Sequence, residues 1–243
     1  MPQLPRYRRR PLFAAAAALA SRPALAAADP VDVLLVLAVD VSRSVDEDEA
    51  RLQREGYRSA VSDPAVVEAI RGGMIGAVGL AYVEWAGAEY QRLVLPWFRV
   101  AGAADATAWS EKLAEAPRAS LSWTSISGAL DFSLKVLAEA PFEATRRVID
   151  VSGDGVNNSG GPVDIARDRV VAEGVTINGL PIVNDRPTFG RMPSVPLDDY
   201  YRENVIGGPG AFVIVAEDFL SFGHAVKRKL IREIAALPGP VAG

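Results

Sequence analysis

The chain of 243 residues has no cysteine and a single histidine, His224. Disulfide bonds, thiolate metal sites and lipid anchors on cysteine are therefore excluded. The Gly-x-Ser-x-Gly motif of many serine hydrolases is also missing, and one histidine within an expected helix argues against a catalytic triad or a zinc site. Without disulfide bonds, the protein must be stabilised by its hydrophobic core, and a bound ion is the other available source of stability.

Long apolar runs are missing too. The run "LFAAAAALA" at 12–20 is too short to span a bilayer, and no later stretch reaches that length. It stands between the basic "PRYRRRP" and the small residues of "PALAAADP", which is the order found in a secretory signal peptide. We therefore expect a signal peptide over residues 1–28, cleaved near Ala26–Ala28. An uncleaved basic tail and an N-terminal anchor are the alternatives.

Removal of this segment changes the charge of the protein. The first 28 residues contain five Arg and no acidic residue, so residues 29–243 hold 21 basic and 30 acidic residues, a formal charge of −9. So acidic a chain is a poor candidate for binding nucleic acid or an anionic membrane. We expect one domain over residues 29–243, periplasmic or secreted, without a membrane span in the mature chain.

The residues after the expected signal alternate between strand-like and helix-like stretches. Strands are expected at 31–39, 74–86, 90–100, 146–152, 175–182 and 211–216, and helices at 47–63, 104–116, 124–140, 163–174 and 217–237. This alternation predicts an α/β fold, a doubly wound and mostly parallel sheet with helices on both faces. Pro96 favours an edge position for its strand, which we expect to pair antiparallel to the strand before it.

The segment 184–210 interrupts this alternation. It is rich in proline and too long for an ordinary connection between two elements. We expect a functional loop, a small subdomain or an irregular excursion packed on the sheet. Tyr200 and Tyr201 in this segment, and Trp123 elsewhere, are candidate contacts for a protein partner, because interface anchors are often aromatic. Packing in the core is the alternative for all three.

Polar residues gather where the expected strands end. Asp40, Ser42 and Ser44 follow the first strand, Asp154 follows the strand "RRVIDVS", and Thr124 opens an expected helix. Ligands of open α/β sheets bind at the carboxyl ends of the strands. In extended chain, positions i, i+2 and i+4 face the same way, so the first three side chains can point at one place. We expect all five side chains to converge.

These five side chains offer only oxygen ligands, which suit a hard divalent cation such as Mg²⁺ or Mn²⁺. Two carboxylates neutralise the charge of the ion, and the hydroxyls add none. The metal therefore stays electrophilic and keeps a position open to an acidic ligand. We expect the seryl and threonyl oxygens to touch the ion, and the aspartates to bind it directly or through water.

The order of three motifs resembles the metal-ion-dependent adhesion site of von Willebrand factor type A domains. The resemblance covers about residues 30–235, and it extends to a bacterial exported subfamily without an assigned function through "SGDGVNN" and "YYRENVIGGPGAFV". The motifs are Asp40-x-Ser42-x-Ser44, Thr124 in "TSISGAL", and Asp154-Gly155 in "SGDGVNN".

This resemblance implies a doubly wound sheet, a Mg²⁺ at its top, and reversible binding of an Asp or Glu carboxylate of a partner protein. It also implies a binding domain rather than an enzyme. The chain departs from the family at one position. Where the family usually reads Thr-Asp-Gly, this chain has Gly153 before Asp154. A supporting hydroxyl is therefore missing at this place, or Ser152 supplies it.

Three other interpretations stay open. "SGDGVNN" also resembles a motif of haloacid-dehalogenase-type phosphatases, with Asp40 as the nucleophile, although Ser42 and Asn158 stand where that family has carboxylates. A structural domain whose motif binds no metal is the second interpretation. In the third, Ser44 only caps the following helix. The acidic run Asp46–Glu49 is expected to be the solvated first turn of that helix, where the helix dipole favours acids.

Overall fold

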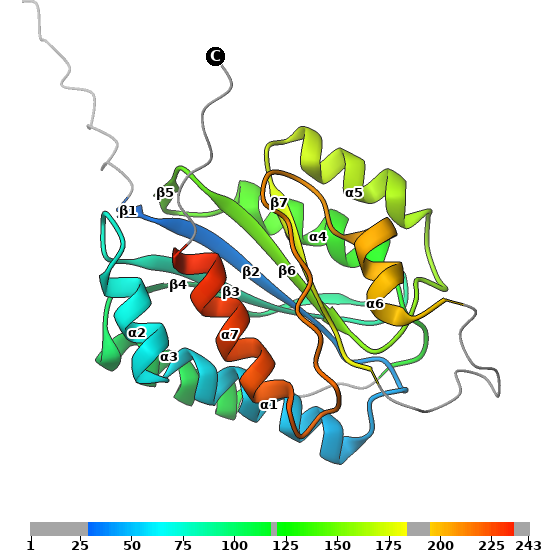
Figure 1. Ribbon diagram of the computed structural model, residues 1–243, viewed down its shortest axis with the longest axis horizontal. Helices are drawn as coiled ribbons and strands as arrows, with labels where there is room; N and C mark the ends of the chain where they lie inside the picture. The colour runs from blue at the N-terminus through cyan, green and yellow to red at the C-terminus, as the bar shows by residue number, and fades with distance from the viewer. Residues whose placement is uncertain (1–28, 118–120, 184–194, 236–243) are drawn as a thin grey trace, which may run out of the picture.

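A five-stranded sheet lies at the centre of the computed structural model, which describes residues 29–117, 121–183 and 195–235 (Figure 1). The strand order is β4-β3-β2-β6-β7, and all neighbours are parallel except β3 and β4. The strands are β2 (Val33–Asp40), β3 (Val78–Trp85), β4 (Gln91–Val100), β6 (Arg147–Gly153) and β7 (Thr176–Pro181). The predicted mostly parallel sheet with one antiparallel edge strand is confirmed.

Helices cover both faces of this sheet, as expected for a doubly wound fold (Figure 1). One face carries α1 (Glu47–Val61), α2 (Pro64–Arg71), α3 (Ala103–Glu115) and α7 (Phe222–Ala235). The other carries α4 (Ile126–Ala138), α5 (Val163–Ala172), the short α6 (Leu197–Tyr200) and the π-helix η1 (Tyr201–Val205). A two-residue pair, β1 (Pro30–Val31) with β5 (Glu143–Ala144), completes the elements.

Strand β2 shows why the sheet is buried on both sides. All eight of its residues are buried. Successive side chains alternate between the two faces. Leu35 and Leu37 therefore pack into the core under α1 and α7, while Leu34 and Val36 pack under α4 and α5. The continuous apolar run seen in the sequence is thus explained by two separate cores.

Helix α1 begins with a capping box. The side chain of Asp46 accepts a hydrogen bond from the N–H of Glu49, and the Glu49 carboxylate accepts one from the N–H of Asp46, both at 2.9 Å. The acidic run is therefore the first turn of a helix, as predicted. The prediction that Ser44 might serve as this cap is wrong, because Asp46 occupies the position.

Two elements differ from the sequence prediction. The stretch 211–216 forms no named strand, and it pairs with β7 and the residue after it through isolated bridges, from Val213 to Gly179 and from Ala216 to Ile182. Helix α7 begins at Phe222 rather than at residue 217. The reason is a turn before it, in which the N–H of Ser221 donates to the Asp218 carboxylate at 2.6 Å. The sequence analysis did not predict α2.

Of the segment 184–210, residues 184–194 lie outside the described residues. The described remainder contains α6 and η1, of which η1 packs against α5 and β7. Residues 1–28 are also outside, so the signal peptide stays a prediction. Within the part of the chain that the structure describes, no helix is long and apolar enough to cross a membrane.

Candidate metal centre

The predicted ligands come together at the carboxyl edge of the sheet. Asp40 is the last residue of β2, and Asp154 directly follows the neighbouring β6. The Thr124 segment runs along the same edge, because the N–H of Leu121 donates to the Val41 carbonyl at 3.3 Å and the N–H of Ser125 to the Ala86 carbonyl at 2.7 Å. Three distant parts of the chain thus meet at one place.

A chain of hydrogen bonds links four of the five residues. The Asp40 Oδ1 accepts from the N–H of Ser42 at 2.8 Å. The hydroxyls of Ser42 and Ser44 are 2.9 Å apart, and the Ser44 hydroxyl donates to Asp154 Oδ1 at 2.6 Å. Because Ser44 has only one hydroxyl hydrogen, Ser42 must be the donor between the two serines. Thr124 completes the set, since its Oγ1 is 3.5 Å from where a Cβ on Gly155 would lie.

Burial differs sharply across this group. The side chains of Asp40, Ser42, Thr124 and Asp154 belong to residues that are at most 6% exposed, whereas Ser44 is exposed. The site is therefore sunk into the sheet edge and opens to solvent on the Ser44 side. A ligand or partner would approach from that side.

The electrostatics of the site favour a cation. Burial, and after it the negative charge of Asp154, raise the pKa of Asp40 well above its ordinary value. Asp40 Oδ2 is buried and has no hydrogen-bond partner among the described residues. A positive ion between the two carboxylates would offset both the burial and the mutual repulsion.

The residues fit a small, hard divalent ion. Asp40 and Asp154 supply charge, and Ser42, Ser44 and Thr124 supply neutral oxygens, the donor types that Mg²⁺ takes in proteins. No group of three or more His, Cys, Asp or Glu side chains placed to hold a metal occurs in residues 29–117, 121–183 and 195–235. The only metal chemistry supported here is therefore that of a hydroxyl-rich site with two carboxylates.

Two asparagines to which the sequence analysis gave no role at the metal site hold the Thr124 segment. The N–H of Thr124 donates to the Asn158 side chain at 2.8 Å, and the N–H of Asn158 donates back to the Thr124 carbonyl at 2.9 Å. The Asn157 side chain accepts from the N–H of Ser127 at 3.1 Å. The "NN" of "SGDGVNN" thus ties the loop after β6 to the start of α4. Its position three residues after Asp154 was the sequence feature that could have indicated this role.

The three aromatic candidates have different surroundings. Trp123 is 56% exposed, beside Thr124, with a left-handed φ of 73° that is unusual for a large residue. Tyr200 is half-buried, and its hydroxyl accepts from the N–H of Asn157 at 3.2 Å. Tyr201 is fully buried, with its ring against Gly179. The expectation that Tyr201 touches a partner is therefore wrong, since its side chain has no exposed surface.

Ser152 does not supply the hydroxyl that is missing at Gly153. Its Oγ accepts a hydrogen bond from the Tyr57 hydroxyl at 3.0 Å, in the core under α1. Adjacent residues of a strand point to opposite faces. Ser152 therefore faces away from Asp40, and this alternative from the sequence analysis is wrong.

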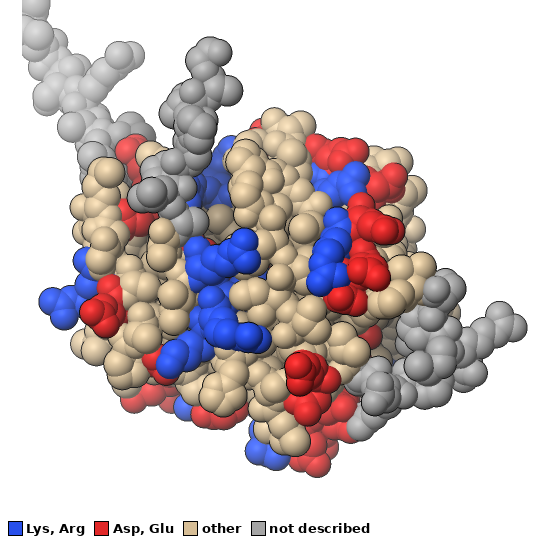
Figure 2. Space-filling view, in the orientation of Figure 1, with Lys and Arg blue, Asp and Glu red and all other residues tan. Residues whose placement is uncertain are grey.

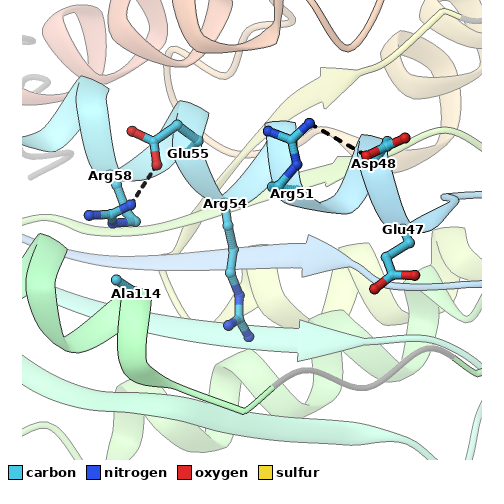
Figure 3. Close-up of a pocket in the computed structure, with 7 residues that line it drawn as sticks. All are labelled: Glu47, Asp48, Arg51, Arg54, Glu55, Arg58 and Ala114. Atoms are coloured by element: carbon cyan, nitrogen blue, oxygen red, sulfur yellow. Dashed lines mark hydrogen bonds and ion pairs between the residues drawn. The ribbon is translucent and has the colours of Figure 1, made fainter.

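A buried ion pair supports the edge of the site. Arg54 in α1 bonds the Glu84 carboxylate at 2.6 Å, and its guanidinium also donates to the carbonyls of Ala116 at 2.5 Å and Pro117 at 3.1 Å. Arg54 thereby holds the end of α3, from which the chain continues toward Thr124. Figure 3 shows Arg54 reaching from α1 toward the sheet in a groove of about 460 Å³.

The rest of this groove carries exposed charges that pair along α1. Arg58 bonds Glu55 at 2.5 Å and Arg51 bonds Asp48 at 3.4 Å, as the dashed lines of Figure 3 mark. These pairs follow helical spacing and lie at the surface, where they add little stability. The groove is therefore a helix surface and not a second site.

Solved structures share this fold. The chain is 15% identical to the von Willebrand factor type A protein from Catenulispora acidiphila, with a TM-score of 0.58 over 84% of this chain and 43% of that one. It is 15% identical to proximal thread matrix protein 1 of the mussel byssus, in a structure whose metal-ion-dependent adhesion site holds zinc, with a TM-score of 0.55 over 84% of this chain and 47% of that one.

A pilus adhesin, SpaC from Lactobacillus rhamnosus GG, gives 16% identity and a TM-score of 0.56 over 85% of this chain and 30% of that one. The chain thus spans less than half of each of these proteins, and the likeness establishes a von Willebrand type A-like fold. Comparison with curated proteins gives no match. The family model described as "Protein of unknown function (DUF1194)" matches residues 30–238, nearly the whole described chain, and the protein belongs to that family.

Proposed function

We propose that this protein is an exported, divalent-metal-dependent binding domain. In this proposal a Mg²⁺ or Mn²⁺ is held by Asp40, Ser42, Ser44, Thr124 and Asp154, and its open position takes a carboxylate of a partner protein. The observation that carries the proposal is the chain of hydrogen bonds from Asp40 to Asp154 around a buried, unpartnered carboxylate oxygen. Zinc in the adhesion site of a neighbour of the same fold supports a metal at this place.

The role of each residue follows from its position. Asp40 supplies charge at the buried end of the site, and Asp154 supplies it near the opening. The two serines and Thr124 add neutral oxygens, so no further negative charge weakens the attraction of the ion for an incoming acid. When bound, the metal supplies Lewis acidity toward that acid. The exposed indole of Trp123 beside Thr124 offers the partner an apolar contact at the rim.

The charge of the surface restricts the partner further. The first turn of α1 holds three acidic residues, Glu47, Asp48 and Glu49, and acidic side chains gather over the edge where α1 begins (Figure 2). Basic side chains gather instead over α7 (Figure 2). An acidic tract would be repelled at the metal edge. The partner group is therefore a single Asp or Glu among neutral or basic residues.

We also propose that the domain binds and does not catalyse. A phosphatase of the haloacid-dehalogenase type needs a second carboxylate two residues after Asp40, but the residue there is Ser42, whose hydroxyl is bonded to Ser44. The two asparagines of "SGDGVNN" hold the backbone of the α4 start instead of a metal. The pilus adhesin among the neighbours supports a binding role. Export is part of the proposal and rests on the expected signal over residues 1–28.

The melting temperature of the purified protein tests the metal site. Ligand at a hundred times its dissociation constant stabilises by about 2.7 kcal/mol, which is about 5–10 °C for a domain of this size. We expect that shift with Mg²⁺ or Mn²⁺ over EDTA in the wild type, and none in Asp40→Ala. A wild-type protein that shows no shift with either ion at millimolar concentration contradicts the proposal.

The partner chemistry needs its own test. Peptides with a single Glu between neutral or basic residues are compared with the same peptides carrying Gln. We expect binding that requires both Mg²⁺ and the carboxylate, and that is lost in Asp154→Ala. Equal binding of Glu and Gln peptides, or binding that survives EDTA, would argue for a domain whose motif has no metal function. Release of phosphate from a general phosphatase substrate by wild type but not Asp40→Asn would favour an enzyme.

A further inference from the structure

Two glycines on neighbouring strands make room for the Tyr201 side chain. Gly179 in β7 pairs beside Val151 of β6, and Gly153 ends β6. A Cβ on Gly179 would lie 2.7 Å from the Tyr201 ring, and a Cβ on Gly153 would lie 3.0 Å from the Tyr201 hydroxyl. The Gly179 distance is shorter than real Cβ contacts, so a larger residue there would displace the tyrosine, and a Cβ on Gly153 would press tightly on the tyrosine hydroxyl.

The space beside Gly153 brings the Tyr201 hydroxyl close to Asp40, one of the two aspartates of the predicted metal site. The same Cβ position on Gly153 lies 2.9 Å from Asp40 Oδ2. The tyrosine hydroxyl and this carboxylate oxygen thus border one small space. Both are buried, and neither has a hydrogen-bond partner among the described residues. Buried polar atoms without a partner are rare in proteins and require an explanation.

The two groups are complementary. A phenolic hydroxyl has one hydrogen to donate, and the buried Asp40 Oδ2 has no donor among the described residues. A protonated hydroxyl donates, and an ionised carboxylate oxygen accepts. Ser152, the other hydroxyl near Gly153 in sequence, is bonded to Tyr57 on the opposite face.

We propose that Tyr201 is a positioning residue for the metal site, and that its hydroxyl donates a hydrogen bond to Asp40 Oδ2, directly or through one water, when the ion is bound. This inference rests on the proposed function. The bond fixes the orientation of the ionised carboxylate, in the way that hydrogen-bond partners of metal ligands generally do. It also links η1, which carries Tyr201, to Asp40, the last residue of β2.

Tyr201→Phe tests the inference because it removes only the hydroxyl. Affinity for Mg²⁺ is measured by titration of the EDTA-treated protein, and the melting temperature is measured in EDTA. We expect the affinity to fall about tenfold, while the melting temperature in EDTA stays unchanged or rises, because an unpartnered buried hydroxyl is lost. Tyr57→Phe is the matched control, since it removes a buried hydroxyl from the other face of β6. It is expected to lower the melting temperature and to leave the affinity unchanged.

The outcomes separate this inference from the function on which it rests. Wild-type affinity in Tyr201→Phe, in a wild-type protein that binds Mg²⁺, overturns the positioning role and leaves the metal site intact. A lower melting temperature in EDTA with unchanged affinity means that Tyr201 is only a packing residue, and overturns it as well. If the wild-type protein binds neither Mg²⁺ nor Mn²⁺, the proposed function fails and the inference fails with it.

Discussion

The Ser44 hydroxyl donates to Asp154 Oδ1 at 2.6 Å, across 110 positions of the chain. This contact joins the loop after β2 to the loop after β6, two strands that are paired in the sheet. Because the strands are parallel, both loops leave the sheet at the same edge. The bond therefore shows that the two halves of the motif meet at one place. Ser44 is the only exposed residue among the five predicted ligands.

Ser44→Ala is expected to weaken Mg²⁺ binding without harming the fold. The serine is exposed and does not cap α1, so the free energy of unfolding in EDTA should change by less than about 0.5 kcal/mol. The loss of a ligand oxygen and of the bond to Asp154 should lower the affinity about tenfold or more. Titration calorimetry with Mg²⁺ checks this, with Ser221→Ala, a serine in the turn before α7, as the control. Unchanged affinity would place Ser44 outside the coordination.

Arg54→Ala is expected to destabilise the protein strongly. The Arg54 side chain is 9% exposed and bonds the carboxylate of Glu84, whose side chain is 2% exposed, so the substitution removes a positive charge that faces a buried carboxylate. Removing one partner of a buried pair costs about 3–5 kcal/mol. Urea unfolding in EDTA measures this loss. Arg51→Ala on the same helix is the control, since Arg51 is 69% exposed and pairs with the exposed Asp48. It should cost less than about 1 kcal/mol.

A loss in Arg54→Ala no greater than that in Arg51→Ala would contradict the importance of the buried pair. Arg54 also bonds the carbonyls of Ala116 and Pro117. The variant should therefore lose Mg²⁺ affinity as well, because the segment that leads to Thr124 is less well held. Stability and affinity falling together distinguishes Arg54 from Tyr201, for which only the affinity is expected to fall.

Much of this arrangement was readable in the sequence because it depends on local order. The apolar run of β2 and the hydroxyl alternation after Asp40 predicted a strand that ends in a group of polar side chains, and the structure places Asp40 and Ser42 there. The strand period alone would also have excluded Ser152 as a neighbour of Asp40, since Ser152 and Gly153 must face opposite sides. The error came from sequence proximity, which says nothing about the face of a strand.

Other features depend on contacts between distant residues, and no local pattern shows them. Tyr201 was a candidate contact for a partner because interface anchors are often aromatic. Its burial depends on Gly153 and Gly179, two glycines on different strands whose missing side chains leave room for the tyrosine. Helix α2 was overlooked although Asp63 and Pro64 are a cap and a first helical residue. A helix of eight residues has only about two turns, so its hydrophobic periodicity was too short to be recognised in the sequence.

Gly179→Ala is expected to lower the stability by overpacking. Its Cβ would lie 2.7 Å from the Tyr201 ring and 3.1 Å from Ile206, so the tyrosine must move. Such additions in a packed core cost about 1–3 kcal/mol. Gly102→Ala is the matched control, because no atom lies within 4 Å of its Cβ position and its φ is 179°, which any residue adopts. Equal melting temperatures of both variants would show that Tyr201 is loosely held.

The pH dependence of stability is expected to reflect a buried charge cluster under α7. The Lys229 ammonium lies 2.5 Å from both Asp150 and Glu233, and all three side chains are fully or almost fully buried. One cation thus faces two carboxylates. Burial raises the pKa of Asp150 to about 7. The positive charge of Lys229 opposes this rise, and the negative charge of Glu233 adds to it.

The sign of the effect follows from linkage. Asp150 binds its proton more tightly in the folded protein than in the unfolded chain, where the pKa is about 3.9. The free energy of unfolding therefore falls as the pH rises from about 4 to about 7 and is level above that. Asp150→Asn mimics the protonated side chain and leaves Lys229 paired with Glu233, so it should remove this part of the fall.

The measurement is the melting temperature of the wild type and of Asp150→Asn between pH 5 and pH 8. The variant should be the more stable protein throughout this range, and its advantage should grow between pH 5 and pH 7 and then level off. Two pKa units at about 1.4 kcal/mol each make about 3 kcal/mol, so the difference in melting temperature should grow by about 6–12 °C at this size. The contribution of Asp40 cancels because both proteins contain it. Asp48→Asn, on an 87% exposed side chain, should follow the wild type at every pH. A variant that is less stable than the wild type at pH 8 would mean that Asp150 is ionised throughout and that its bond to Lys229 stabilises the fold.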